Sequence, residues 1–284
     1  MNNTQSKFPD LTFVIPFYYD GEFRLENLYC VLKILGRFNA NVMVVEQGSC
    51  QHFTNTDYYF DNAGINGQYC FVPNKNVCEF ISSNYVRTAP HGNFEFLSQV
   101  VPITTILNDI FYRTRIINIG LKKVKTKYFA IYDTDVFFKD EKYVYAYKKL
   151  KEGFTFVYPY DGKFVDIERQ YIKDGIIKEK ESFANGSYGG AVFGNLSKYQ
   201  ECGLENENLI GWSPDDVERQ ARVSILGRSI CRIEGKCYHI LHPKIGFASS
   251  ANPFNEQNLK EYGRVMNMKK EELKEYIKNW NWTK

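Results

Sequence analysis

Long apolar runs are missing from this chain of 284 residues. Charged residues interrupt every hydrophobic stretch before the roughly 18–20 residues that cross a bilayer, so we expect no transmembrane helix. The N-terminal residues MNNTQSKFPD contain no apolar core, so no signal peptide is expected. Internal repeats, low-complexity segments and an obvious domain linker are also missing. The composition, with 44% hydrophobic and 24% charged residues, is that of a globular protein and excludes a membrane-spanning or disordered one.

A large excess of positive or negative charge is also missing. The chain has 36 Lys and Arg against 33 Asp and Glu, and its net charge of +3 is too weak to predict nucleic-acid binding. The seven cysteines are odd in number and form no CxxC pair. We therefore expect reduced thiols in a cytoplasmic protein rather than a small disulfide scaffold. Only four histidines are present, whereas Tyr and Phe are plentiful at 21 and 22.

Apolar strand patterns alternate with helical ones and predict an α/β protein. Buried strands at 11–15 and 41–45 flank a helix at 25–35, which is a βαβ unit with parallel strands. The pattern of turn residues in 50–100 predicts loops and short strands. The later predictions are a helix at 103–123, strands at 128–132, 155–158, 229–233 and 238–241, a close-packed Gly-rich run at 187–194, a helix at 213–226 and helical structure from 255 on.

Two carboxylates, Asp133 and Asp135, directly follow the strand predicted at 128–132. Ligands bind at the carboxyl ends of strands in open α/β sheets, and unpaired carboxylates are costly to bury. The pair therefore indicates a divalent cation that bridges phosphate oxygens, with an ordinary Asp-rich turn as the alternative. His239 and His242, three residues apart, could reach the same cation. The alternative for them is one core and one surface histidine.

Asp215 and Asp216 fall in the first turn of the helix predicted at 213–226, which Ser213 is expected to cap. Acids at this position can simply complement the helix dipole. The dipole also favours the ionised carboxylate that a general base needs. Trp212 offers a flat apolar face that could stack on a sugar ring or pack in the core. Arg113, in a cluster with Arg115, could bind phosphate oxygens or lie on a solvated helix face.

The sequence resembles GT-A glycosyltransferases, specifically the β-1,4-galactosyltransferase type, its C-terminal galactosyltransferase-like region, and bacterial capsule and lipopolysaccharide relatives. The resemblance spans most of residues 11–243. The segments that carry it occur in the family's order: FVIPF at 13–17, VVEQGS at 44–49, FYRTRIINIG at 111–120, DTD at 133–135, YGG at 188–190, GWSPDD at 211–216, and the histidine pair. Ser213-Pro214 departs from the family's Gly-Gly and Asp215 from its Glu. Residues 50–100 and 254–284 have no counterpart.

The resemblance implies a GT-A fold, with a Rossmann-like mixed sheet flanked by helices in a single domain. It divides the chain into a nucleotide-sugar-binding half (1–140), an acceptor-binding and catalytic half (141–253) and a helical tail (254–284). The implied nucleotide-sugar contacts are Pro16, Phe17, Tyr18, Glu46, Arg113, Asp133 and Gly190. The implied metal ligands are Asp135, His239 and His242, with Asp133 nearby. The implied acceptor contacts are Trp212, Tyr188 and Asp215, and the catalytic acids are Asp216 as base and Asp215.

The implied activity is inverting, metal-dependent transfer of a hexose, galactose first, from a UDP-sugar to a saccharide or lipid-linked saccharide acceptor in surface polysaccharide synthesis. Mn²⁺ or another divalent cation is the implied cofactor. A sugar nucleotidyltransferase is a rival, but the chain lacks a Gly-rich basic loop after its first strand. A non-catalytic sugar-nucleotide or glycan-binding protein is another. No nucleic-acid partner is expected. The tail, with Trp280 and Trp282, predicts either a helical cap or a peripheral contact with the inner face of a membrane.

Overall fold

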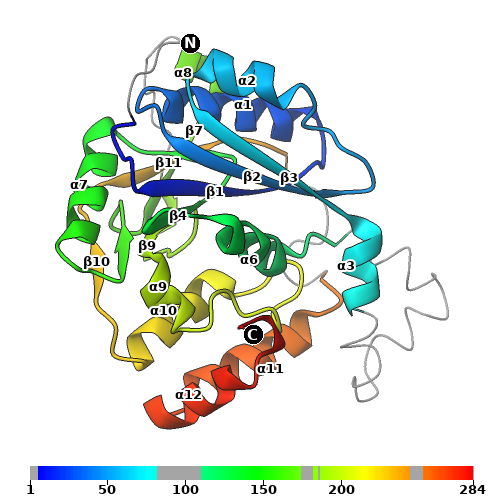
Figure 1. The fold of residues 1–284 in the computed structure, drawn as a ribbon, viewed down its shortest axis with the longest axis vertical. Helices are drawn as coiled ribbons and strands as arrows, with labels where there is room; N and C mark the ends of the chain where they lie inside the picture. Colours follow the sequence, from blue (N-terminus) through cyan, green and yellow to red (C-terminus); the bar gives the residue numbers. More distant parts are fainter. Residues whose placement is uncertain (1–5, 82–109, 174–181, 185, 244–251, 284) are drawn as a thin grey trace.

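The computed structural model describes residues 6–81, 110–173, 182–184, 186–243 and 252–283, and the strands in this part of the chain form two sheets (Figure 1). The large sheet has the spatial order β10 (Ile230–Arg232), β6 (Phe156–Tyr158), β9 (Ala191–Asn195), β4 (Tyr128–Tyr132), β1 (Leu11–Tyr18), β2 (Asn41–Gly48) and β3 (Asn66–Pro73). The small sheet has the order β5 (Val136–Phe137), β11 (Lys236–Ile240), β7 (Lys163–Ile167) and β8 (Ser182–Ala184).

The large sheet is mixed. β1 pairs in parallel with β2 and β4, whereas β9 runs antiparallel between β4 and β6. Every residue of β4 is buried, as its continuous apolar sequence predicts. Strands from both sides of residue 140 therefore belong to one sheet and one domain. The predicted α/β class and the parallel βαβ unit at its start are confirmed.

Helices cover both faces of the large sheet. Figure 1 shows α1 (Glu22–Gly36) and α2 (Thr56–Ala63) on one face of β1, β2 and β3, and α6 (Arg113–Lys123) on the other. A Cβ atom at Gly120 in α6 would lie 2.5 Å from Val14 Cγ1 and 3.0 Å from Val45 Cγ2. The missing side chain of Gly120 therefore lets the C-terminal half of α6 approach β1 and β2 closely.

Three predictions about local structure are wrong in part. Residues 50–81 form α2, β3 and α3 (Asn74–Ile81) rather than only loops and short strands, because β3 is an edge strand that pairs with β2 along its whole length but buries little. The helix predicted at 103–123 begins at Arg113, and 103–109 lie outside the described residues. Gln47 anchors the segment before α6 to β2: it accepts from the Tyr112 amide (2.8 Å) and donates to the Ile110 carbonyl (2.8 Å).

The third concerns the start of α10 (Asp215–Ile225). Ser213 is not its cap: the N-cap residue is Pro214, and the Ser213 hydroxyl instead donates to Asp215 Oδ1 at 3.3 Å. The predicted strands at 155–158, 229–233 and 238–241 occur with slightly different ends as β6, β10 and β11. In the Gly-rich run at 187–194, residues 187–190 form a loop and residues 191–194 belong to β9.

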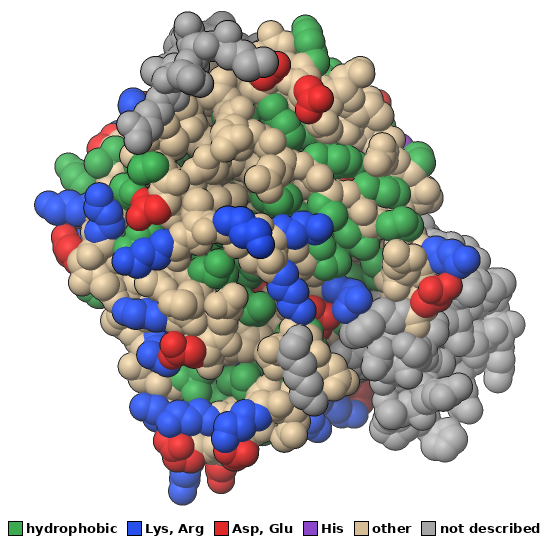
Figure 2. Space-filling model, in the orientation of Figure 1, with side chains coloured by type: hydrophobic (Ala, Val, Ile, Leu, Met, Phe, Trp, Pro, Cys, Tyr) green, Lys and Arg blue, Asp and Glu red, His purple; other side chains and the backbone are tan. Residues whose placement is uncertain are grey.

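The remaining helices are α7 (Asp140–Lys151), α8 (Arg169–Lys173), α9 (Leu196–Gln200), α11 (Asn255–Met266), α12 (Lys270–Lys278) and the short η3 (Asn281–Thr283). None of the helices described has the length and apolarity needed to cross a membrane. On α12, basic and acidic side chains lie side by side (Figure 2), as in the pair of Lys274 with Glu271 at 2.8 Å.

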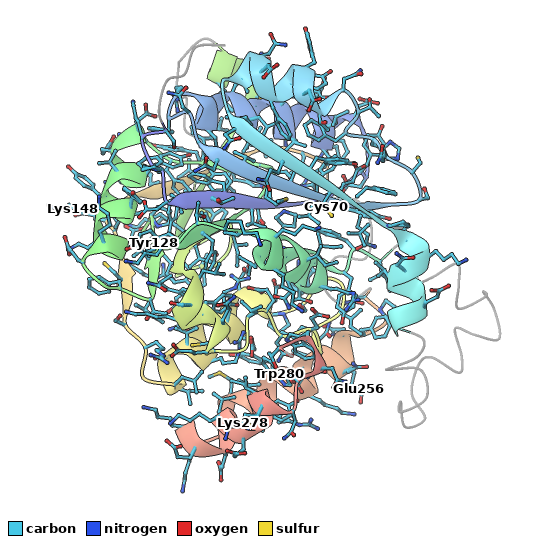
Figure 3. All side chains as sticks on the ribbon, in the orientation of Figure 1. Cys70, Tyr128, Lys148, Glu256, Lys278 and Trp280 are labelled. Atoms are coloured by element: carbon cyan, nitrogen blue, oxygen red, sulfur yellow. The ribbon has the colours of Figure 1, made fainter. Side chains whose placement is uncertain are left out.

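The tail packs as a cap on the domain. Trp280 and Trp282 are both buried, and the Trp282 indole donates to the Gly203 carbonyl at 3.2 Å. Trp280, labelled in Figure 3, lies against the guanidinium of Arg222, 5.2 Å from its ring centre. The apolar faces of both indoles therefore pack against the rest of the protein. A membrane contact by this tail stays a prediction.

Candidate active site

Side chains predicted to be functional come from distant parts of the chain and gather near the carboxyl ends of β1 and β4. Asp133 and Asp135 follow β4, Arg113 opens α6, and Asp215 and Asp216 open α10. β11 reaches the same place because it pairs antiparallel with β5 and its Ile240 amide donates to the Asp135 carbonyl at 2.7 Å. The small sheet thus places the two histidines near the carboxyl ends of β1 and β4.

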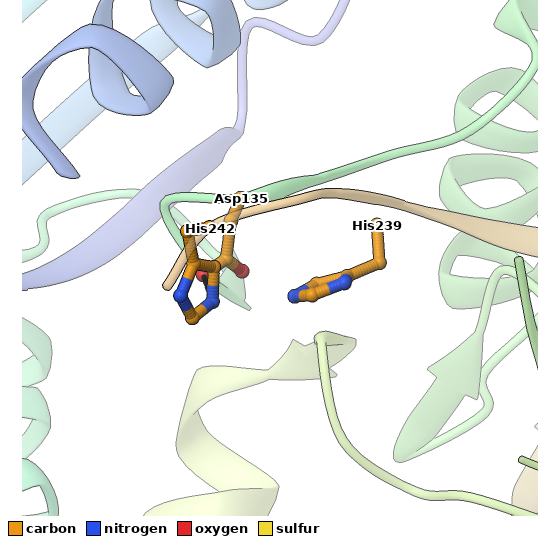
Figure 4. Close-up of side chains that lie close together, drawn as sticks. All are labelled: Asp135, His239 and His242. Atoms are coloured by element: carbon orange, nitrogen blue, oxygen red, sulfur yellow. Dashed lines mark ion pairs between the residues drawn. The ribbon is translucent and has the colours of Figure 1, made fainter. Parts of the chain in front are cut away.

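Asp135, His239 and His242 form a candidate metal centre (Figure 4). One ligand atom from each residue lies within 4.8 Å of the other two. His242 Nε2 is 3.1 Å from Asp135 Oδ2. One carboxylate and two imidazoles suit a divalent transition-metal ion. The three side chains therefore fit such an ion, although both the DxD pattern and the spacing of the histidines are weak signals taken singly.

The Nδ1 atom of each imidazole already has a hydrogen-bond partner. His239 Nδ1 is 2.8 Å from Asp166 Oδ1, and His242 Nδ1 is 2.8 Å from the Pro243 carbonyl oxygen. A proton on each Nδ1 satisfies these acceptors, so Nε2 is the nitrogen of each ring that would ligate an ion, as is usual for metal-binding histidines. Asp166 was not predicted. It lies opposite His239 in the register of β7 and β11, which only the folded chain reveals.

Electrostatics favour an ionised Asp135. Burial acts to raise the pKa of its carboxyl, but the hydrogen bond from His242 and the charge of Arg24 outweigh it and lower this pKa to about 2. The same hydrogen bond raises the pKa of His242. Arg24 Nη1 is 2.5 Å from Asp135 Oδ2, so an arginine that the sequence patterns did not single out borders the candidate metal centre.

Beside the metal centre, Arg113 joins three carboxylates. Its guanidinium lies 2.7 Å from Asp133, forms a close ion pair with Asp215 and is 3.5 Å from Asp216. Burial raises the pKa of Asp215 to about 7 despite the charge of Arg113, and burial also raises the pKa of Asp133. Arg113 therefore ties the DxD segment to the start of α10 and does not lie on a solvated helix face.

Asp216 is the more open of the two acids on α10. Its side chain is 29% exposed, against 9% for Asp215. Arg219 Nη1 binds Asp216 Oδ1 at 2.8 Å, while a Cβ atom at Gly189 would lie 2.9 Å from Asp216 Oδ2. Gly189 is thus the residue of the 188–190 segment that gives this carboxylate room. Arg219 was missed, although its position three residues after Asp216 on a helix could have indicated the contact.

The predicted acceptor residues differ in exposure. Trp212 is 57% exposed, so its indole is not a core side chain. Tyr188 is half-buried, and the guanidinium of Arg232 lies 4.0 Å from its ring centre.

Gly190, a predicted nucleotide-sugar contact, has a φ of +76°, and a Cβ atom there would lie 2.9 Å from Phe164. This glycine is therefore required by the local backbone and packing.

The predicted nucleotide residues Pro16, Phe17 and Tyr18 lie at the end of β1. Phe17 is fully buried, whereas Tyr18 stacks on Phe111 with ring centres 5.4 Å apart. Their contacts with a nucleotide stay predictions.

Glu46 is fully buried. Its carboxylate accepts hydrogen bonds from the His52 amide (2.7 Å), the Phe53 amide (3.2 Å) and the Tyr69 hydroxyl (2.5 Å). These bonds give Glu46 a structural role in the loop after β2. A direct contact with a nucleotide base stays a prediction.

No family model matches the sequence, and no curated protein is similar to it in sequence. The fold, however, is similar to that of solved proteins. A structure of GalNAc-T7 with UDP, GalNAc and Mn²⁺ has a TM-score of 0.56 and 13% identity over 94% of this chain and 50% of that one. Staphylococcus aureus TarS has a TM-score of 0.54 and 12% identity over 94% of this chain and 42% of that one.

The chain therefore spans half or less of the length of these two proteins. The similarity establishes the fold: a GT-A architecture with a mixed seven-stranded sheet flanked by helices. The expected GT-A fold is confirmed.

Proposed function

We propose that this protein is a metal-dependent glycosyltransferase that moves a hexose from a UDP-sugar to a saccharide acceptor with inversion. The observation that carries the proposal is a candidate metal centre of Asp135, His239 and His242 in a GT-A fold, with Arg113 joining Asp133 of the same DTD segment to the open carboxylate of Asp216. GalNAc-T7, which shares this fold, was crystallised with UDP and Mn²⁺. A sugar nucleotidyltransferase and a glycan-binding protein do not require a general base beside the metal centre.

Asp135, His239 and His242 would hold the divalent cation, Mn²⁺ in our proposal. Such a cation acts as a Lewis acid that neutralises the charge of a departing diphosphate. Asp166 and the Pro243 carbonyl orient the two imidazoles. Arg113 holds Asp133 and Asp215 in fixed positions, which leaves Asp216 as the carboxylate available to the acceptor.

Asp216 would accept the proton of an acceptor hydroxyl as that oxygen attacks the anomeric carbon. The carboxylate must be ionised to do this. Arg219 Nη1 holds Asp216 Oδ1 at 2.8 Å in the first turn of α10. Trp212 and Tyr188 would orient the acceptor sugar, which lowers the entropic cost of the reaction. Galactose is the first donor to test, and a surface polysaccharide or its lipid-linked precursor is the first acceptor.

The decisive experiment measures UDP release from UDP-hexoses, with and without Mn²⁺ and a panel of saccharide acceptors. We expect Mn²⁺-dependent release that an acceptor accelerates. Release of pyrophosphate from UTP and a sugar phosphate would instead identify a nucleotidyltransferase. Binding of a UDP-sugar with no turnover on any acceptor would favour a binding protein. Failure to bind any UDP-sugar with Mn²⁺ present would refute the proposal.

Asp166→Asn should weaken Mn²⁺ binding by roughly 10–100-fold, because an amide holds the His239 imidazole less firmly than a carboxylate does. Titration calorimetry without a nucleotide measures this directly. Asp57→Asn, on the exposed surface of α2, is the control and should leave the affinity unchanged. Equal affinities in all three proteins would show that Asp166 does not support a metal ligand.

Trp212→Ala should raise the KM for the acceptor roughly tenfold, since an indole face that covers a sugar contributes on the order of 1–2 kcal/mol. The donor KM should change little. Because Trp212 is 57% exposed, its removal leaves no core cavity. Leu259→Ala, which removes another exposed apolar side chain (54%), is the matched control. A change in donor KM alone would move Trp212 out of the acceptor site.

A further inference from the structure

Among the residues that the structure describes, Arg24 is the one lysine or arginine in contact with a carboxylate oxygen of the candidate metal centre. It lies in the first turn of α1, directly after the loop that follows β1. Its Nη1 is 2.5 Å from Asp135 Oδ2 and 3.5 Å from the Thr134 hydroxyl. Only 18% of its side chain is exposed. The guanidinium is therefore part of the site and does not belong to the outer surface.

A second carboxylate fixes the direction of Arg24. Asp20 accepts from Nε at 3.1 Å through Oδ1 and from Nη2 at 3.1 Å through Oδ2. This bidentate pairing uses one edge of the planar guanidinium and leaves Nη1 pointed at Asp135. The neighbouring Phe23 stacks on His242 with ring centres 5.8 Å apart. The start of α1 thus contacts two of the three candidate metal ligands.

One oxygen atom, Asp135 Oδ2, receives both Arg24 Nη1 and His242 Nε2. A divalent ion held by Asp135 and His242 would share this carboxylate with the guanidinium. Two cations close together in a half-buried site repel each other strongly. The repulsion is relieved when a polyanion lies between or beside them. A nucleoside diphosphate has that charge, and a guanidinium is suited to its phosphate oxygens.

We propose that Arg24 couples cation binding to diphosphate binding: it opposes a metal ion bound alone and donates to phosphate oxygens when the metal and a nucleoside diphosphate are bound together. This inference rests on the proposed function and adds a donor-binding residue to it. Asp20 acts as a positioning residue that keeps Arg24 at the site while its Asp135 contact is exchanged. Coupling of this kind is reciprocal, so each ligand tightens the binding of the other by the same factor.

The test measures the Kd of Mn²⁺ with and without saturating UDP, and the Kd of UDP with and without Mn²⁺, by titration calorimetry. In the unaltered chain we expect UDP to tighten Mn²⁺ binding about tenfold or more. In Arg24→Gln the metal alone should bind at least as tightly as before, because a cation has been removed. The coupling factor should fall below about threefold, and UDP should bind more weakly with Mn²⁺ present.

Two further variants keep the test decisive. Asp20→Asn touches no metal ligand and should lower the coupling factor in the same direction, even if Arg24→Gln folds poorly. Arg37→Gln removes an exposed arginine just after the other end of α1, 2.8 Å from Asp140, and should leave all four constants unchanged.

An unchanged coupling factor in both Arg24→Gln and Asp20→Asn would overturn the proposal. So would Mn²⁺ binding that weakens in Arg24→Gln without UDP, because Arg24 would then serve only to orient Asp135. An unaltered chain that binds neither Mn²⁺ nor UDP would overturn the proposed function along with this inference. One that binds both independently would overturn this inference alone.

Discussion

Replacing Asp216 with Asn should lower the rate of sugar transfer by about 10²–10⁴-fold, the contribution that general bases usually make. The amide keeps the size of the carboxylate and its acceptor oxygen for Arg219, which lies 2.8 Å away. It cannot take a proton at neutral pH. Binding of UDP and Mn²⁺ should stay the same, since Asp216 is not among the ligand atoms that meet around Asp135.

The control must separate the loss of a general base from the loss of a negative charge in the first turn of a helix. Asp140 is also an acid in the first turn of a helix, α7, and its ion pair with Arg37 is exposed. Asp140→Asn therefore removes a first-turn charge without touching the site, and transfer should be unaffected. Single-turnover rates with saturating donor and acceptor report the chemical step. A normal rate in Asp216→Asn would show that another group accepts the proton.

Asp215 is the other candidate base, and the structure argues against it. Its carboxylate is 9% exposed and pairs closely with Arg113, and burial raises its pKa to about 7. The ionised carboxylate is tied to an arginine and is almost closed to solvent, so an acceptor hydroxyl has little access to its oxygens. Asp215 is thus better placed to shape the site than to exchange protons with an acceptor.

The elements predicted well from sequence are those whose signal is local. β1, β2 and β4 are rich in apolar residues because both faces of these strands are buried, and α1, between β1 and β2, follows from the spacing of its apolar residues. β3 is poorly predicted because it lies at the sheet edge and buries only Val72 of its eight residues, so its strand character depends on pairing with β2.

The same distinction holds in the site. The ligand spacing of His239 and His242 is visible in sequence because both lie on one short segment. Asp166 and Arg24 could not be predicted, since they meet His239 and Asp135 across 73 and 111 residues of chain. Such contacts depend on strand register and on the placement of α1, which no local pattern encodes. Supporting residues are therefore harder to find from sequence than the groups they support.

Replacing Arg219 with Met should cost roughly 3–5 kcal/mol of folding free energy, as breaking buried ion pairs usually does. Arg219 and Glu205 are each 1% exposed, and Nε and Nη2 of the arginine bind the two carboxylate oxygens at 2.7 and 2.9 Å. Without Arg219, Glu205 keeps the Tyr199 hydroxyl as a donor at 2.7 Å but loses its counter-charge. Urea unfolding of the whole chain measures the loss.

The matched control is Arg37→Met, which breaks an ion pair that is 50% and 54% exposed on its two sides and should change stability by less than about 1 kcal/mol. A loss in Arg219→Met no larger than this would show that the buried pair contributes little. Adding Glu205→Gln to Arg219→Met removes the stranded charge, so the double variant should be more stable than Arg219→Met alone.

The double variant also separates the two contacts that Arg219 makes. Its stability should recover in part, yet Asp216 still lacks the Nη1 donor that holds its carboxylate in place. We therefore expect sugar transfer to stay reduced in the double variant even where the protein is fully folded. If transfer instead recovers with stability, Arg219 serves the fold only, and Asp216 is held by its helix and by Arg113. If transfer stays reduced, Arg219, held in the core by Glu205, directly positions the proposed base Asp216.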